Sequence, residues 1–291
     1  MKRILIISDG KPGHLNQSIA FCKIKKISYD ILTVEYKSKF FKSLSYLFDK
    51  IGFYTNYLYK PYKKINHEFY DAIVCTGSST YYLTKYLSKE YDIKSIVLML
   101  PKSYRYEDFT YIVAQEHDNP PKLDNLIKVP LNISFSIPKH LIKNETNKKA
   151  IGIIVGGNNA IFTLKTEEFK KQLDGIFEKY KNHAKYITTS RRTPIQVEEL
   201  IEKYEFDYKL IYSKQPTINP IPDFLELCEE LFITVDSTSM LSEARANSDA
   251  KINIIKLESK KEDTKYHKLA QKVEALNSRV NFEKKIMKIE I

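Results

Sequence analysis

Residues 3–17, RILIISDGKPGHLNQ, hold a short apolar run, a turn rich in Gly and Pro, and the beginning of a helical segment. An apolar run of this length that leads directly into a helix is typical of a buried strand in a parallel α/β sheet. The same order returns at residues 150–157, AIGIIVGG, where a second apolar run ends in glycines. These two stretches predict two α/β domains, each beginning with a buried strand.

Further apolar runs alternate with segments of helical length in both halves of the chain. Strands are predicted at residues 71–75, 94–100, 109–114, 184–190, 208–212, 231–236 and 252–257. Helices are predicted at residues 15–27, 166–182, 194–204, 222–230, 237–246 and 264–281. We expect two Rossmann-like, doubly wound domains that face a central cleft, because open α/β sheets bind ligands beyond the carboxyl ends of their strands.

A polar segment at residues 138–149, which contains Pro, Asn and Lys, interrupts this pattern. It sets the expected boundary between an N-terminal domain at 1–140 and a C-terminal domain at 141–291. The last helix is then available to pack back on the N-terminal domain.

The composition limits the class of protein. The chain has 291 residues, of which 43% are hydrophobic and 29% are charged, which fits folded domains rather than disorder. Its first apolar run is too short for a signal-peptide core or a membrane span, and its three cysteines lack metal-ligand spacing. We expect a cytoplasmic protein without a metal site. The net charge of +11 favours an anionic partner, although an AT-rich genome would produce the same excess of lysine.

The first loop, residues 8–17, carries groups that could bind an anion and move a proton. Its glycines permit close backbone approach, and the helix that follows directs free N–H groups toward a ligand. A lysine can pair with a phosphate, and the Asp and His can take a proton from a hydroxyl. The same residues would also suit an ordinary turn with a helix cap. The candidates are Asp9, Lys11, Gly13, His14 and Gln17.

Three polar segments follow predicted strands of the second half: VGGNNAIF at 155–162, TTSRRTP at 188–194 and TVDSTSMLSEA at 234–244. Glycines suit contact with phosphate or ribose, an arginine fork binds phosphate, and a helix start rich in hydroxyls holds an anion. A carboxylate further along that helix can accept hydrogen bonds from ribose. Turns and helix caps would need similar residues. The candidates are Gly156, Gly157, Asn158, Ser190, Arg191, Ser237, Thr238, Ser239 and Glu243.

A fifth segment, QEHDNPP at 115–121, places His117 and Asp118 after another predicted strand. They could position an acceptor or act as a base, or they could be structural. The sequence contains no Ser or Cys at a nucleophile turn and no HExxH or Cys/His metal spacing, so we predict neither a hydrolytic triad nor a metal centre.

Taken in order, SDGKPGHLNQ, EHD, GGNN, TTSRRTP and DSTSMLSEA resemble the mitochondrial-fission ELM (elongated mitochondria) family over nearly the whole chain. Bacterial members of that family are described as glycosyltransferases. The resemblance implies a GT-B architecture with the acceptor mainly on the N-terminal domain and the donor nucleotide mainly on the C-terminal domain. It places the candidates of the first loop, with His117 and Asp118, on the acceptor side, and those of the second half on the donor side.

On this basis we predict an inverting, metal-independent glycosyltransferase of cell-envelope polysaccharide biosynthesis. It would move a sugar from a nucleotide-activated donor to a surface glycan or a lipid-linked acceptor, with no cofactor besides the donor substrate. Arg191 and the helix start at 237–239 would stabilise the leaving phosphate. Either Asp9 or His14 would deprotonate the acceptor. We favour Asp9 as the base and His14 as a positioning donor.

The alternative prediction is a non-catalytic, nucleotide-binding adaptor at a membrane surface. Residues 37–64 hold many lysines and aromatic side chains, a combination suited to an anionic bilayer at the inner face of the membrane. A glycosyltransferase with a lipid-linked acceptor would use the same surface. We do not expect nucleic acid as a partner, because the sequence contains no recognised nucleic-acid-binding module.

Overall fold

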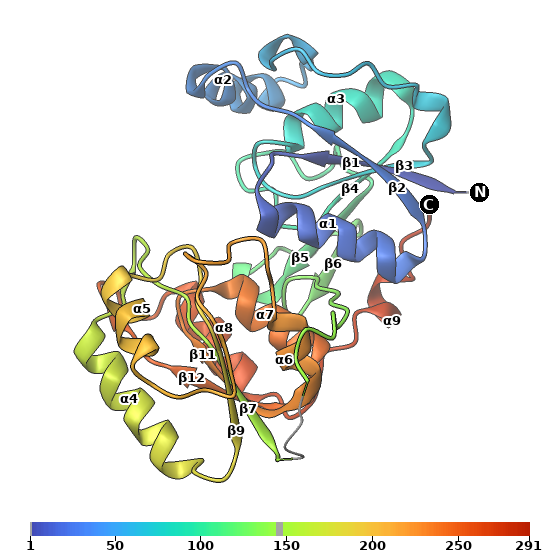
Figure 1. The fold of residues 1–291 in the computed structure, drawn as a ribbon. Helices are drawn as coiled ribbons and strands as arrows, with labels where there is room; N and C mark the ends of the chain where they lie inside the picture. The colour runs from blue at the N-terminus through green and yellow to red at the C-terminus, as the bar shows by residue number, and fades with distance from the viewer. Residues whose placement is uncertain (1, 144–147) are drawn as a thin grey trace. The chain divides into compact units, whose positions relative to one another are not determined.

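The computed structural model describes residues 2–143 and 148–291, so residues 144–147 of the expected polar boundary lie outside the described residues. The chain divides into two compact units (Figure 1). The first unit comprises Met1–Phe135 and Asn281–Ile291, and the second comprises Ser136–Val280. In the described part of the chain, no helix is both long enough and apolar enough to cross a membrane.

The first unit contains a six-stranded parallel sheet in the order β2-β1-β3-β4-β5-β6. Apolar side chains from β1 and β3 are fully buried in it. The strands are β1 (Arg3–Ser8), β2 (Ser28–Thr33), β3 (Ala72–Cys75), β4 (Lys94–Val97), β5 (Tyr111–Gln115) and β6 (Leu126–Val129). The helices are α1 (Pro12–Lys25), α2 (Lys39–Lys50), α3 (Tyr81–Tyr91) and the short α9 (Glu283–Ile286), which contacts α1.

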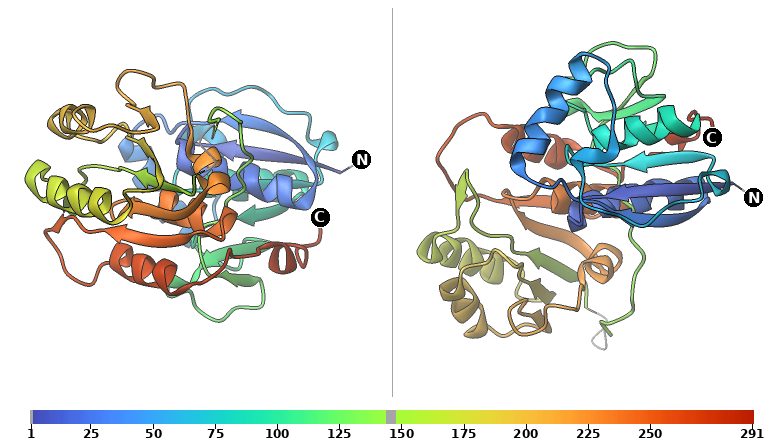
Figure 2. Two further views of the ribbon diagram at one scale, coloured as in Figure 1. Left: turned by 60° about the horizontal axis from the view of Figure 1, so that its bottom comes forward. Right: turned by 90° about the horizontal axis from the view of Figure 1, so that it is seen from above.

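The second unit contains a five-stranded parallel sheet in the order β10-β9-β7-β11-β12, and Figure 2 shows both sheets from two further directions. Its strands are β7 (Ala150–Ile154), β9 (Ala184–Thr188), β10 (Tyr208–Leu210), β11 (Cys228–Thr234) and β12 (Lys251–Ile255). Its helices are α4 (Thr166–Lys179), α5 (Ile195–Glu202), α6 (Ile221–Leu227), α7 (Thr238–Asn247) and α8 (Lys265–Ala275). Two short strands, β8 (Phe162–Thr163) and β13 (Glu258–Ser259), form an antiparallel pair.

The predicted fold class, two Rossmann-like α/β units with parallel sheets, is confirmed. Some predicted helices extend beyond the observed ones. The helix predicted at 222–230 ends at Leu227 as α6, and the next residues extend β11, where Cys228 pairs with Ala150. The helix predicted at 264–281 ends at Ala275 as α8. Strands β2, β6, β8 and β13 were missed. The last two are only two residues long, and the first two lie at the edges of the first sheet. In β2 and β6 most residues remain partly or fully exposed, so neither shows the continuous apolar run of a central strand.

In each sheet the first strand lies between its neighbours. The chain leaves β1 for β2 on one side and later returns to β3 on the other, and β7 lies in the same way between β9 and β11. At such a switch point the loops beyond the two adjacent strands diverge and leave a crevice, which is where open α/β sheets bind ligands. The loops after β1 and β3 therefore define one candidate site, and the loops after β7 and β11 define another.

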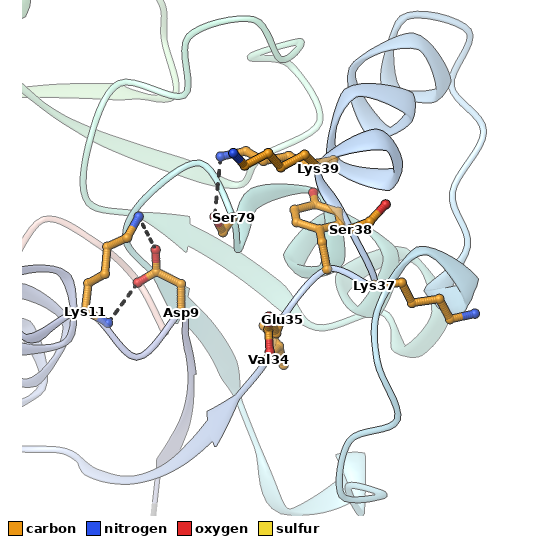
Figure 3. Close-up of a pocket in the computed structure, with 10 residues that line it drawn as sticks. Asp9, Lys11, Val34, Glu35, Lys37, Ser38, Lys39 and Ser79 are labelled. Carbon is orange, nitrogen blue, oxygen red and sulfur yellow. Dashed lines mark hydrogen bonds and ion pairs between the residues drawn. The ribbon is translucent and has the colours of Figure 1, made fainter.

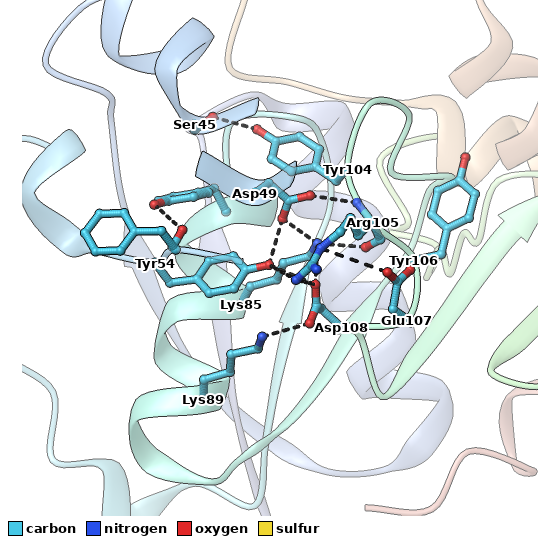
Figure 4. Close-up of polar contacts among 12 residues, drawn as sticks. Ser45, Asp49, Tyr54, Lys85, Lys89, Tyr104, Arg105, Tyr106, Glu107 and Asp108 are labelled. Atoms are coloured by element: carbon cyan, nitrogen blue, oxygen red, sulfur yellow. Dashed lines mark hydrogen bonds and ion pairs between the residues drawn. The ribbon is translucent and has the colours of Figure 1, made fainter. Parts of the chain in front are cut away.

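A buried ion pair holds α2 against α3 in the first unit (Figure 4). Asp49 of α2 and Lys85 of α3 are both fully buried, 2.5 Å apart. Lys85 Nζ also donates to the carbonyl of Arg105, and the Arg105 N–H donates to Asp49, both at 2.7 Å. Burial lowers the pKa of Lys85, while the carboxylates of Asp49 and Asp108 oppose that change. Removing one partner would leave a buried charge uncompensated, so this network fixes the position of α2.

A buried carboxylate also orders the beginning of the second unit. Asp223 of α6 accepts hydrogen bonds from four consecutive backbone N–H groups at residues 139–142, at 2.5 to 3.3 Å. Part of the polar segment expected at 138–149 is therefore bound tightly to α6.

Candidate functional site

Asp9 and His14 form a hydrogen-bonded pair at the switch point of the first unit. His14 Nδ1 lies 3.1 Å from both carboxylate oxygens of Asp9. Lys11 Nζ lies 3.2 Å from the same carboxylate, whose side chain is 5% exposed. The turn between them is short because Gly10 adopts a φ of +74° and its N–H donates to Ser8 Oγ.

The electrostatics of this pair indicate which of the two residues is suited to act as a base. Burial raises the pKa of Asp9, but the hydrogen bond and charge of His14, together with Lys11, outweigh it and bring the pKa to about 2. A carboxylate with so low a pKa is a poor base at neutral pH, which argues against the role of base predicted for Asp9. In the neutral ring, the bond to Asp9 places the proton of His14 on Nδ1, so Nε2 carries the free lone pair.

Gly77, which was not predicted as a site residue, completes the surroundings of His14. It follows β3 with a φ of +96°, and a Cβ at this position would overlap the His14 ring. A hydrogen bond of 2.9 Å between Ser18 Oγ and Thr76 Oγ1 joins α1 to the loop after β3. The sequence showed a Gly after this strand, but nothing in it indicated that a histidine from the first loop fills the space.

A pocket of about 350 Å³ opens beside Asp9 and Lys11 (Figure 3). Ser79, from the loop after β3, lines it together with residues that precede or begin α2. Lys42 of α2 reaches the same loop, since its Nζ donates to Ser78 Oγ at 2.8 Å. None of the lining residues that precede or belong to α2 was predicted as a candidate, because α2 itself was not predicted.

The other acceptor-side candidates do not join this pair. Gln17 is buried, and its Nε2 donates within α1 to the carbonyl of Gly13 at 3.4 Å. His117 and Asp118 belong to a short 3₁₀ helix after β5, two strands along the sheet from β3. Asp118 pairs with Lys102 at 2.9 Å.

In the second unit, a buried aspartate connects the three polar loops. The side chain of Asp236 is fully buried after β11 and pairs with Arg192 Nη2 at 2.6 Å. The N–H of Gly157 also donates to it, at 3.1 Å. Burial raises the pKa of Asp236, while Thr234, Arg192 and the Gly157 N–H oppose the rise. The sequence placed Asp236 in the right segment but did not single it out.

The glycines after β7 serve loop packing. A Cβ at Gly156 would overlap the Asp236 carboxylate, and a Cβ at Gly157 would overlap the Arg192 carbonyl. Asn158 also folds its own loop, since its Oδ1 accepts from the Leu164 N–H at 2.8 Å. The interpretation that these glycines make room for phosphate or ribose is therefore unnecessary, although the loop still lies at the switch point.

The two adjacent arginines have different environments. Arg192 is held by Asp236, whereas Arg191 is exposed and makes no ion pair with the described residues. Their neighbour Ser190 is bound to Thr193, whose Oγ1 accepts from the Ser190 N–H at 2.9 Å. Of the two arginines, Arg191 is therefore the one whose charge is not already paired, and its binding to a ligand stays a prediction.

The start of α7 lies directly after Asp236. Ser237 caps the helix by accepting from the Met240 N–H at 3.3 Å, Thr238 is partly buried, and Ser239 is exposed. Glu243 lies further along α7, where it accepts from Ser136 Oγ at 3.2 Å, and burial raises its pKa. Among the residues that the structure describes, no group of three or more His, Cys, Asp or Glu side chains could hold a metal ion.

Comparison with solved structures identifies the fold. The Staphylococcus aureus MnaA–UDP co-structure aligns with a TM-score of 0.55 at 12% identity, over 97% of this chain and 94% of that chain. A Listeria monocytogenes structure, described as a UDP-N-acetylglucosamine 2-epimerase, aligns with a TM-score of 0.56 at 10% identity, over 94% and 86%. The chain therefore shares the GT-B type of α/β fold with these two structures.

The family can also be named. The family model described as mitochondrial fission ELM1 matches residues 12–290, so the chain belongs to that family, and the predicted resemblance is confirmed. A relative in Rickettsia prowazekii (strain Madrid E), named uncharacterized protein RP120, is 25% identical over 301 residues, which cover 84% of this chain and 80% of the relative.

The Asp9–His14 pair predicts how Asp9 titrates. The carboxyl carbon of Asp9, followed by NMR, should titrate near pH 2. In His14→Ala the midpoint should rise by about one pH unit or more. A nearby cationic hydrogen-bond donor lowers the pKa of a carboxyl by at least that much, and the variant lacks this donor. Since the folded-state pKa lies below the unfolded value of about 3.9, this pairing stabilises the fold above pH 4 and is lost as the pH falls toward 2. An unchanged midpoint in His14→Ala would contradict the assignment. Lys170→Ala, which removes an exposed ion pair with Asp174 in the second unit, serves as a control.

Proposed function

We propose that this protein is an inverting glycosyltransferase that uses a nucleotide-activated sugar. The observation that carries the proposal is the Asp9–His14 pair at the switch point of the first unit. A histidine oriented by a buried carboxylate suits removal of a proton from a hydroxyl, which is the step that activates a sugar acceptor. The fold and the UDP bound by the S. aureus neighbour support a nucleotide-sugar donor.

The donor is assigned to the second unit. Its phosphates would lie near the start of α7, where Ser239 is exposed and the first N–H groups of the helix are available, with Arg191 as a counter-charge. Asp236 and Arg192 would hold this loop in place, and Glu243 would accept hydrogen bonds from ribose. As the bond between the anomeric carbon and the phosphate oxygen breaks, the negative charge that develops on the phosphate is stabilised by Arg191 and α7.

We assign the base to His14. The acceptor hydroxyl gives its proton to His14 Nε2, its oxygen attacks the anomeric carbon from the face opposite the phosphate, and the nucleotide leaves with the bonding electrons. Asp9 keeps the ring in the required tautomer and stabilises the imidazolium that forms. This is the reverse of the assignment favoured from the sequence, and it follows from the low pKa of Asp9.

Nucleotide binding provides the first test. In a thermal-shift screen of nucleotides and nucleotide sugars, at least one nucleoside diphosphate, with UDP as the first probe, should raise the Tm. By calorimetry, Arg191→Gln should weaken that ligand about tenfold or more, because a charge-assisted hydrogen bond to phosphate is lost. Arg279→Gln is a matched control, since Arg279 is exposed and pairs with Asp249. If no nucleotide binds, or if Arg191→Gln binds it normally, the donor assignment fails.

Catalysis provides the second test, with the donor and acceptor identified by product analysis. His14→Ala should lower turnover by about 10²- to 10⁴-fold, the usual range for loss of a general base, while donor affinity stays within a few fold. Asp9→Asn should also lower turnover strongly, because an amide can donate to Nδ1, which leaves the proton on Nε2, and cannot stabilise the imidazolium. A fully active His14→Ala variant would refute His14 as the base. Nucleotide binding without any sugar transfer would favour the non-catalytic adaptor.

We further propose that the first unit meets an anionic membrane surface. Phe40 and Leu47 of α2 are 69% and 56% exposed, and Ile51 is 71% exposed just beyond the helix. Lys37 and Lys39 precede these side chains in the chain. Apolar side chains flanked by lysines suit an interface with acidic headgroups.

Vesicle binding tests this surface. The protein should sediment with anionic vesicles more than with neutral ones, and the difference should shrink as salt is added. Phe40→Ser combined with Leu47→Ser should reduce the binding severalfold. Ile195→Ser is a matched control, because Ile195 is 55% exposed on α5 of the second unit. Equal sedimentation with both kinds of vesicle would contradict the membrane surface. The excess of lysine would then be explained by the base composition of the genome.

A further inference from the structure

The pocket beside Asp9 carries more positive than negative charge. Four lysines and two carboxylates line it, together with Ser38 and Ser79 (Figure 3). Both carboxylates already have cationic partners: Asp9 contacts Lys11 and His14, and Glu35 pairs with Lys60 at 2.7 Å. The four lysines are Lys11, Lys37, Lys39 and Lys42. Lys39 and Lys42 therefore line the pocket without neutralisation by its carboxylates, whereas Lys37 Nζ lies over the Tyr57 ring, 3.4 Å from its centroid.

Lys42 is the most informative of these lysines. It is half-buried, and its Nζ donates to two neutral groups, Ser78 Oγ at 2.8 Å and Ser79 Oγ at 3.4 Å. No carboxylate of the described residues lies within ion-pair distance of it. A partly desolvated ammonium group is normally paired with an anion, since burial without one is unfavourable. Burial, followed by the charge of Lys11, lowers the pKa of Lys42, and the charge of Asp9 only partly offsets this.

The position of Lys42 is fixed before any ligand arrives. It lies on α2, which the buried Asp49–Lys85 pair holds against α3. Ser45 of α2 also bonds, through its Oγ, to the hydroxyls of Tyr36 and Tyr104 at 3.0 Å each. The serines that Lys42 contacts belong to the loop whose Gly77 packs against His14. The cation and the proposed base are thus held on one rigid framework.

We propose that this pocket binds a phosphate group of the sugar acceptor, so that a hydroxyl on the same molecule is presented to His14. Lys42 and Lys39 would supply the charge, and Ser78 and Ser79 would supply hydroxyl donors. The acceptor is accordingly a phosphorylated saccharide, either free or linked to a lipid through its phosphate. This inference rests on the proposed function, since it assumes that His14 faces an acceptor.

Calorimetry with the full chain tests the subsite without requiring turnover. Glucose 6-phosphate and inorganic pyrophosphate should bind, whereas glucose should not. Lys42→Met should weaken both anions about tenfold or more, and Lys42→Arg should keep them within a few fold. Lys50→Met, on the same helix but outside the pocket, should bind them normally. Unchanged thermal unfolding of Lys42→Met would show that the fold is intact.

Further measurements distinguish a phosphate of the donor from a phosphate of a free or a lipid-linked acceptor. UDP affinity should not change in Lys42→Met. If the UDP affinity of Lys42→Met falls as far as its pyrophosphate affinity, the pocket binds the donor and the inference is overturned. The inference is also overturned if Lys42→Met binds glucose 6-phosphate and pyrophosphate normally. Binding of the soluble sugar phosphate supports a free acceptor, and binding only to polyprenyl phosphate in detergent micelles, lost in Lys42→Met, supports a lipid-linked one. Normal phosphate binding with no detectable sugar transfer would remove the proposed function while leaving a phosphate site in place.

Discussion

The order of the strands is the constraint on which both candidate sites depend. Because β1 and β7 each lie between strands reached by opposite crossovers, the loops that leave them separate from the loops of β3 and β11. Polar groups can gather there without interrupting the cores, which remain apolar beneath them. The first loop brings Asp9 and His14 to one such place, and the loop after β11 brings Asp236 to the other. If the strands were paired in chain order, β3 would not lie beside β1 and β11 would not lie beside β7, so neither the contact between Gly77 and His14 nor the hydrogen bond from Gly157 to Asp236 would form.

Buried carboxylates then convert these crevices into fixed shapes. Asp236 joins the loops after β7 and β9, Asp49 holds α2, and Asp223 binds the backbone at the beginning of the second unit. Each has strong donors around it, as a charge removed from water requires. The consequence is that the side chains proposed to act on ligands, among them Arg191 and Lys42, extend from loops and helices whose own backbone is already held by other residues.

The sequence was sufficient for elements whose signal is local. Central strands such as β1 and β7 are continuous apolar runs, and the loop from Asp9 to His14 contains its acid-base groups within six residues. The sequence was insufficient where the role of a residue depends on a partner far away in the chain. Lys42 is one lysine among many until it is placed beside Ser78, and nothing in Arg191–Arg192 states which of the two pairs with Asp236. The edge strand β2 was missed for a related reason, because its exposed residues interrupt the apolar pattern.

Because Gly77 and His14 are in contact, the two positions differ in the substitutions that they tolerate. Space for the imidazole exists because residue 77 has no side chain, and the φ of +96° independently favours glycine. A chain that loses His14 would still keep its glycine for the sake of the turn. A chain that acquires a side chain at 77 must displace the ring and strain the backbone at once. Variation in this part of the molecule is therefore expected to proceed in one direction, with the histidine replaceable before the glycine and not the reverse.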